Sequence, residues 1–169
     1  TANKALIAKH GKKLKEAAEK SFSNIGFEAS VAGVIPIVKI LNEFLISNKV
    51  KKVFGVLNGT SNFILSKMLE TKKNFNDILD EAKKLGYAEA DPKFDINGTD
   101  TAHKIAILSM ISFENELNLN TIYTEGIEKI ELDDLLFADS LGYKIKLIGI
   151  TEKVKDKVSQ YVYPCLINK

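Results

Sequence analysis

The spacing of apolar residues changes along this chain, and the change restricts the folds that the chain can adopt. Up to about residue 141 the apolar residues recur mostly at helical intervals, as they do in residues 36–46. From Tyr143 onward they alternate with lysines, as residues of a half-buried β-strand do. Because the predicted helices and strands follow one another in mixed order, we expect an α+β fold in which helices cover a mixed β-sheet.

The predicted elements have boundary signals of their own. Asn58-Gly59 marks a turn before a helix, Asn76 precedes an acidic first turn, and Gly86 and Gly142 lie where helices commonly end. Helices are predicted over residues 2–20, 36–46, 61–70, 77–85, 99–111 and 134–141. The first of these contains Gly11 and is predicted to be interrupted or split there. Strands are predicted over residues 27–31, 51–57, 143–149 and 158–164, and a loop over residues 87–98.

Composition and charge exclude several classes of protein. The chain has 169 residues, the length of one ordinary domain. Its net charge is +2 and it contains no block of like charges, so we expect no nucleic-acid partner. No apolar run approaches the roughly 18 residues of a membrane span, and no secretory signal opens the chain, so we expect no membrane association. A single cysteine, Cys165, cannot form an internal disulfide, which favours a cytoplasmic protein.

The two ends of the chain have the character of internal segments. There is no initiator methionine, and Thr1 leads directly into the first helical pattern. Residues 163–169 resemble a strand followed by an unfinished connection. We therefore expect the chain to be part of a longer protein.

Acidic residues gather around one lysine in residues 89–104. Glu89, Asp91, Asp95 and Asp100 precede Lys104, and the last two are four residues apart. On a helix that begins near residue 99 they would share one face. Nearby carboxylates favour the charged ammonium, whereas burial favours the neutral amine that can accept a proton. The spacing fits either a general acid/base lysine or an ordinary solvated pair on a helix.

The stretch from residue 82 to residue 104 resembles the signature of homoserine dehydrogenase. The residues that match at the family's spacing are Ala82, Gly86-Tyr87-Ala88, Asp91-Pro92, Asp95-Ile96, Gly98, Asp100 and Lys104. Further segments resemble the same family in the same order, at residues 1–4, 27–33, 57–62 and 141–147. The resemblance thus extends over essentially the whole chain.

The resemblance implies an oxidoreductase that uses NADP or NAD to interconvert L-aspartate 4-semialdehyde and L-homoserine, in threonine, methionine and isoleucine biosynthesis. It implies that residues 1–24 adjoin an N-terminal Rossmann domain, and that residues 25–169 belong to a substrate-binding and dimerisation domain that continues beyond them. The chain contains no G-x-G, so the main cofactor site would lie outside it. Alone it would be inactive, and the parent would be a homodimer.

The resemblance also implies roles for Tyr87 and for residues of the acidic stretch 89–104, which we call the acidic loop. Lys104 would donate and accept the proton on the substrate oxygen. Asp100 and Glu89 would bind homoserine, whose ammonium group accounts for the acids, and Asp100 would also orient Lys104. Asp95 would support them. Tyr87 would form a wall of the substrate pocket, although a packing role fits it equally well.

Further roles concern the cofactor and an ion. Lys4 would be a second catalytic lysine near the nicotinamide, and Gly86 would allow the cofactor to approach the backbone. A sodium-type monovalent cation would be held by Glu28 and the carbonyl groups of Val31, Gly33 and Ile35, since oxygen ligands suit a hard cation. Without the resemblance, Glu28 would be interpreted as a half-buried acid of a strand.

The chain also contains two histidines and one cysteine, and its sequence leaves two other functions open. His10 and His103 match no catalytic position of the family, so we expect surface or packing roles, and Cys165 has no activating neighbour. The first rival function is a dimerisation or interaction module. The second is a different enzyme on the same scaffold that acts on another small amino-acid aldehyde.

Overall fold

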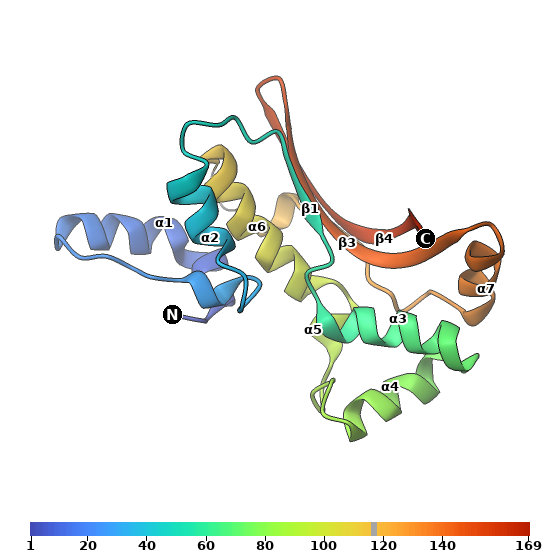
Figure 1. Ribbon diagram of the computed structural model, residues 1–169. Helices are drawn as coiled ribbons and strands as arrows, with labels where there is room; N and C mark the ends of the chain where they lie inside the picture. The colour runs from blue at the N-terminus through green and yellow to red at the C-terminus, as the bar shows by residue number, and fades with distance from the viewer. Residues whose placement is uncertain (116–117) are drawn as a thin grey trace. The chain divides into compact units, whose positions relative to one another are not determined.

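The computed structural model describes residues 1–115 and 118–169. Within these ranges the backbone forms seven α-helices and a four-stranded sheet (Figure 1). The helices are α1 (Lys4–Lys20), α2 (Ile37–Lys39), α3 (Gly59–Thr71), α4 (Phe75–Lys84), α5 (Lys93–Ile96), α6 (Thr99–Phe113) and α7 (Leu132–Ser140). The strands are β1 (Lys52–Gly55), β2 (Tyr123–Thr124), β3 (Tyr143–Val154) and β4 (Lys157–Asn168). The predicted α+β class is confirmed.

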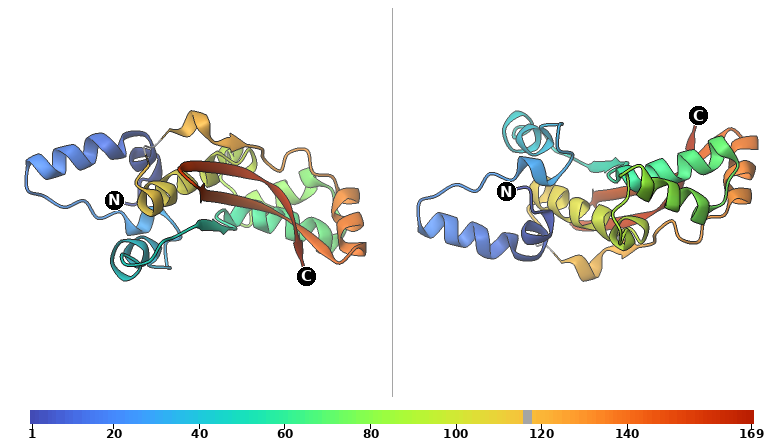
Figure 2. Two further views of the ribbon diagram at one scale, coloured as in Figure 1. Left: turned by 90° about the horizontal axis from the view of Figure 1, so that it is seen from above. Right: turned by 90° about the horizontal axis from the view of Figure 1, so that it is seen from below.

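The sheet has the order β1-β3-β4-β2, so its two central strands are consecutive in the sequence. β3 and β4 are each 12 residues long and form a hairpin, which Figure 2 shows as two long curved strands side by side. The sequence predicted both strands but made them shorter and the turn between them longer. The turn is short because Lys155 adopts a φ of 55°, which reverses the chain within residues 155–156.

The chain divides into two compact units. The first unit consists of Thr1–Phe54, Ala102–Tyr123 and Ile150–Tyr161, and the second of Gly55–Thr101, Thr124–Gly149 and Val162–Lys169. α6 and all four strands contribute residues to both units. Among the described residues, none of the helices combines the length and the apolar character that a membrane crossing requires.

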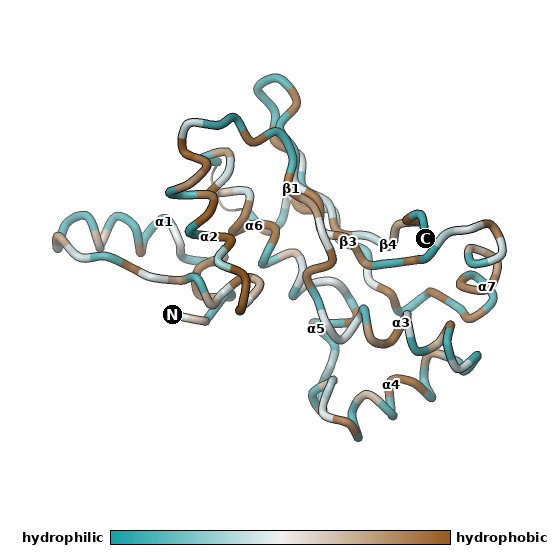
Figure 3. Tube along the Cα trace, in the orientation of Figure 1, coloured by the Kyte–Doolittle hydropathy of each residue, from teal (hydrophilic) through white to brown (hydrophobic). Residues whose placement is uncertain are grey.

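In the first unit, α1 continues through Gly11 without the predicted interruption. The side chain of Asn3 caps the helix, because its Oδ1 accepts a hydrogen bond from the Leu6 amide at 2.9 Å. Ile7 and Ala8 are each only 2% exposed. The cap and the burial of the first turns offset the cost of about 1 kcal/mol that a helical glycine carries. Most of the remaining helix is hydrophilic (Figure 3).

The strand predicted at residues 27–31 is wrong. Glu28–Ser30 form a short 3₁₀ turn instead, in which Ser30 Oγ donates to the Phe27 carbonyl at 2.6 Å. The helix predicted after it is present but irregular, since α2 passes directly into a π-helical turn over Ile40–Phe44. Both oxygens of the Glu28 carboxylate accept hydrogen bonds from α2 amides, and this contact competes with an extended conformation.

A buried polar network joins α6 to the hairpin within the first unit. Ser109 Oγ accepts from Thr151 Oγ1 at 2.9 Å and from Gln160 Nε2 at 2.8 Å, and it donates to Asn115 Oδ1 at 3.0 Å. Ser109 and Thr151 are fully buried. A single hydroxyl group therefore satisfies polar atoms from both strands and from the segment after the helix.

Ser109→Ala should lower the free energy of unfolding by about 2–4 kcal/mol, because it leaves several buried polar groups without partners. Urea denaturation of the variant and the parent protein would measure the difference. Ser112 is the matched control, since its Oγ is buried on the same helix without a hydrogen-bond partner. Ser112→Ala should be neutral or slightly stabilising. Equal losses in both variants would contradict the importance of the network.

The second unit is built around α3, which packs against α4, α5 and α7 (Figure 1). The side chains at its centre are 2% exposed or less: Ile64, Leu65, Met68, Ile78 and Leu135. α3 begins two residues earlier than predicted because Asn58 is its N-cap, and α4 likewise begins earlier, after Asn74. The predicted helix ends are confirmed at Gly86 and Gly142, which adopt φ values of 77° and 86°.

Candidate active site

Two carboxylates of the acidic loop are held together by one asparagine. Asn58 Nδ2 donates to Asp95 Oδ1 at 2.7 Å and to Asp100 Oδ2 at 2.9 Å. The Oδ1 of the same amide accepts the Ser61 amide at 2.7 Å and thereby caps α3. Asn58 is 5% exposed and Asp100 is 6% exposed, whereas Asp95 is half-buried. The amide group thus brings the starts of α3 and α6 together with α5, and places two acids side by side.

The segment that carries Asp95 is fixed from its other side as well. It was predicted to be a loop, but it contains the one-turn helix α5. The Ile127 amide donates to the Ile96 carbonyl at 2.8 Å. Gly98 has a φ of 85°, a backbone conformation that residues with a Cβ rarely adopt. A Cβ there would also lie 3.1 Å from Thr124 Cγ2, so both the conformation and the space favour glycine at this position. These contacts set the position of Asp95 and of the first residues of α6.

Lys104 lies on α6 four residues after Asp100, so the two side chains share one face of the helix. Asp100 occupies the first turn, where the helix dipole stabilises a negative charge. Lys104 itself is half-buried. The predicted helical register of these two residues is confirmed.

Glu89 and Tyr87 follow α4, and both are exposed. The Tyr87 ring stacks on Phe63 of α3, with the ring centroids 4.5 Å apart and the planes inclined by 18°. Its carbonyl accepts a hydrogen bond from Thr60 Oγ1 at 2.7 Å. The packing role that the sequence left open for Tyr87 is therefore present, and its exposed face remains available to a ligand. The structure does not bring Glu89 into the network of Asn58.

The two candidate cofactor residues lie in different units. Gly86 is exposed, and a Cβ at that position would meet no atom within 4 Å. Its positive φ, rather than crowding, is what favours glycine there. Lys4 is the first residue of α1, directly after the Asn3 cap, and is half-buried.

Glu28, one of the predicted cation ligands, contacts α2. Its Oε1 accepts the Val38 amide and its Oε2 accepts the Lys39 amide, both at 2.9 Å. Each carboxylate oxygen keeps a second lone pair, so the predicted donor set of Glu28 and the carbonyl groups of Val31, Gly33 and Ile35 stays a prediction. Across the described parts of the chain, no group of three or more His, Cys, Asp or Glu side chains could hold a metal ion.

Sequence reasoning did not identify Asn58 as a functional residue. The local signal, an asparagine before glycine with a serine three residues later, indicated a turn and a helix start. Its bonds to Asp95 and Asp100 span 37 and 42 residues, so no local pattern contained them.

Comparisons with known proteins identify relatives over the whole chain. The family model described as homoserine dehydrogenase matches residues 36–169. A homoserine dehydrogenase of Neisseria gonorrhoeae is 49% identical over 167 residues, which cover 99% of this chain and 38% of that protein. The chain therefore spans well under half the length of the curated relatives that it matches.

Solved structures give the same result. The crystal structure of a homoserine dehydrogenase from Thiobacillus denitrificans has a TM-score of 0.96 and 48% identity, and the match covers 99% of this chain and 39% of that one. A hyperthermophilic archaeal homoserine dehydrogenase in complex with NADPH has a TM-score of 0.85 and 30% identity, with coverage of 99% and 48%.

Proposed function

Because the chain belongs to the homoserine dehydrogenase family, we propose that it forms the substrate-binding and proton-transfer part of an NAD(P)-dependent enzyme that interconverts L-homoserine and L-aspartate 4-semialdehyde. This reaction would serve threonine, methionine and isoleucine biosynthesis. The observation that supports the proposal most directly is the pair of acids held by Asn58, one of them a helical turn before Lys104.

Lys104 transfers the proton in the proposed reaction. A bound nicotinamide cofactor would supply the hydride chemistry at C4 of homoserine and at the corresponding aldehyde carbon. In the oxidation, the neutral Lys104 amine takes the proton of the C4 hydroxyl as the carbonyl forms. In the reduction, its ammonium gives that proton to the aldehyde oxygen. Asp100 lies on the same face of α6 and orients the Lys104 side chain.

The acidic residues bind the ammonium group of the substrate. Asn58 fixes one oxygen of Asp95 and one of Asp100, so the two carboxylates keep a defined position before any ligand arrives. Two negative charges side by side attract a cationic group and form charge-assisted hydrogen bonds with it. Glu89, on the exposed turn after α4, would complete the contacts to homoserine, and Tyr87 would border it.

The chain also contributes to the cofactor site. The space around Gly86 and its exposed backbone fit the close approach of a flat nicotinamide ring. Lys4, the first residue of α1, would be a second catalytic lysine that contacts the cofactor. The main binding of the dinucleotide would come from a Rossmann domain, with residues 1–24 adjoining it and residues 25–169 in the substrate domain.

The proposal also includes a bound cation, the oligomeric state of the complete protein and its cellular location. A monovalent cation such as sodium would be held by Glu28 and by the main-chain oxygens of Val31, Gly33 and Ile35. The complete protein would act as a homodimer in the cytoplasm.

The proposal is tested by L-homoserine-dependent reduction of NADP⁺ and NAD⁺ by the full-length protein, followed as nicotinamide absorbance. We expect turnover with L-homoserine and at least 100-fold lower kcat/KM with 4-hydroxybutanoate, which lacks the ammonium group; a loss of this order is typical when buried polar groups are left without a partner. Folded, cofactor-binding protein that oxidises neither compound would favour an interaction module. Equal rates with both compounds would contradict the role of the acids.

A further inference from the structure

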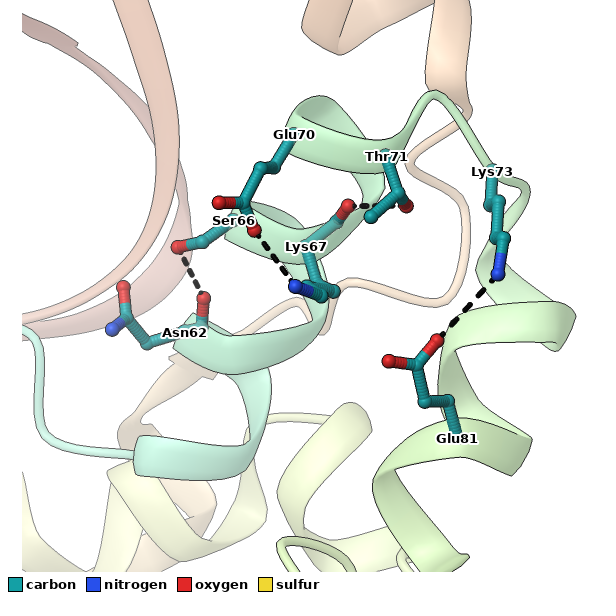
Figure 4. A network of polar contacts seen from close by, with 7 residues as sticks. All are labelled: Asn62, Ser66, Lys67, Glu70, Thr71, Lys73 and Glu81. Atoms are coloured by element: carbon teal, nitrogen blue, oxygen red, sulfur yellow. Dashed lines mark hydrogen bonds and ion pairs between the residues drawn. The ribbon is translucent and has the colours of Figure 1, made fainter. Parts of the chain in front are cut away.

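The second unit contains a lysine ammonium whose hydrogen bonds to described residues all go to neutral oxygens. Lys146 of β3 donates to Asn62 Oδ1 and to Ser66 Oγ, each at 2.6 Å. Ser66 Oγ donates in turn to the Asn62 carbonyl at 2.6 Å, so a lone pair of the hydroxyl faces the ammonium. Figure 4 shows Asn62 and Ser66 one turn apart on the same side of α3. Two of the three N–H groups of Lys146 are used in this way, and one is left for a further acceptor.

The charge of Lys146 is not neutralised by the protein. In the part of the chain that the structure describes, neither Lys146 nor Lys144 forms an ion pair. Burial lowers the pKa of the Lys146 ammonium, and the positive charge of Lys144 lowers it further. A half-buried cation with a like-charged neighbour is stabilised when an anion binds beside it.

This ammonium lines a cavity of about 380 Å³. The two acids on the cavity wall are already paired, Glu70 with Lys67 at 3.0 Å and Asp139 with Lys169 at 2.6 Å. Lys144 and Lys146 are therefore the charged groups of the cavity wall that have no ion-pair partner among the described residues. The rest of the wall is aliphatic: Leu65, Leu69, Leu135 and Ile145. A cationic end and an aliphatic wall match a ligand that has an anionic head and an apolar body.

We propose that this cavity, between α3, α7 and β3, is a binding site for a small aliphatic carboxylate. The ligand carboxylate accepts the remaining N–H of Lys146 and lies near Lys144, and its alkyl group lies against the half-buried side chains of Leu69 and Ile145. The site is independent of the proposed dehydrogenase activity, because none of these residues belongs to the Asp95 and Asp100 pair or to the contacts that hold it.

The test is calorimetric titration of the full-length protein with 3-methylbutanoate, which carries a carboxylate and a branched alkyl group but no ammonium. We expect saturable binding at millimolar concentrations. Lys146→Met keeps an unbranched apolar stem and removes the charge, and it should weaken binding roughly tenfold to a hundredfold. Lys144 is exposed, so Lys144→Met should fold normally and weaken binding by a smaller factor.

Lys73→Met is the matched control, since Lys73 is exposed, pairs with Glu81 and lies outside the cavity (Figure 4). It removes the same charge and should leave binding unchanged. Absence of saturable binding, or equal affinity in the Lys144 and Lys146 variants and the control, would overturn the proposal. If inorganic phosphate bound as tightly as 3-methylbutanoate, the proposed contact between the alkyl group and the aliphatic wall would be contradicted.

Discussion

Replacing Lys104 by methionine should lower kcat about 100- to 10,000-fold, the range expected when a positioned proton donor and acceptor is removed. Methionine keeps most of the apolar stem of the half-buried lysine, so α6 should retain its packing. The affinity for NADPH, measured by fluorescence titration, should change little because the role proposed for Lys104 is at the substrate oxygen. The measurement is steady-state oxidation of L-homoserine by the full-length protein.

Two further variants separate proton transfer from simple charge. Lys104→Arg keeps the positive charge but cannot give up its proton near neutral pH, so it should be almost as slow as Lys104→Met. Lys93→Met removes a lysine from the exposed surface of α5 in the same acidic loop and should leave turnover within about twofold of the parent value, as surface substitutions commonly do. Near-normal turnover in Lys104→Met would exclude Lys104 as the acid/base group.

Replacing Asn58 by aspartate should have the second largest effect, on both stability and substrate binding. The change keeps the shape of the side chain and an oxygen that can cap α3, but it removes both N–H donors to Asp95 and Asp100. Three carboxylates would then lie together. We expect a loss of about 2–4 kcal/mol in the free energy of unfolding at pH 7, and a higher KM for L-homoserine.

The pH dependence of this loss follows from the repulsion. Like charges raise the pKa values of the variant's carboxyl cluster in the folded state above those in the unfolded state. The folded variant therefore binds more protons, and its stability falls relative to the parent as pH rises. The difference between the two proteins should be small near pH 4 and should grow toward pH 7. Urea denaturation across this range measures it.

Asn76→Asp is the matched control for Asn58→Asp. Asn76 is exposed in the first turn of α4, where a negative charge is favourable. The control should alter stability by no more than about 0.5 kcal/mol and leave KM unchanged. An Asn58→Asp variant with the stability and KM of the parent would show that the two hydrogen bonds to the acids are dispensable.

The fold could be predicted where local patterns decide it. The hairpin of β3 and β4 follows from alternating residues, and the ends of α4 and α7 follow from glycines that adopt positive φ. The prediction failed at residues 27–31, where an apolar run favoured a strand. There the Glu28 carboxylate bonds to amides ten and eleven residues away, and a propensity argument does not contain that interaction.

In the candidate site, too, local spacing could be predicted from the sequence and long-range contacts could not. Asp100 and Lys104 could be placed on one helix face because four residues separate them. The residue that holds Asp100 in position, Asn58, could not be predicted from the sequence. It precedes Asp100 by 42 residues, and α3, α4 and α5 lie between the two in the chain. Likewise, the sequence of β3 shows lysines alternating with apolar residues, but not that Lys146 bonds to two side chains of α3.

The long separation between Asn58 and the two acids also determines the order in which the site can form. α3 and α4 depend on local hydrogen bonds, so each can become helical before the chain has closed on itself. The acid pair requires closure of loops of 37 and 42 residues, which costs conformational entropy that only the finished packing offsets. A cationic ligand that bound the completed pair would therefore favour the fully closed chain over every partly folded form and would stabilise this unit.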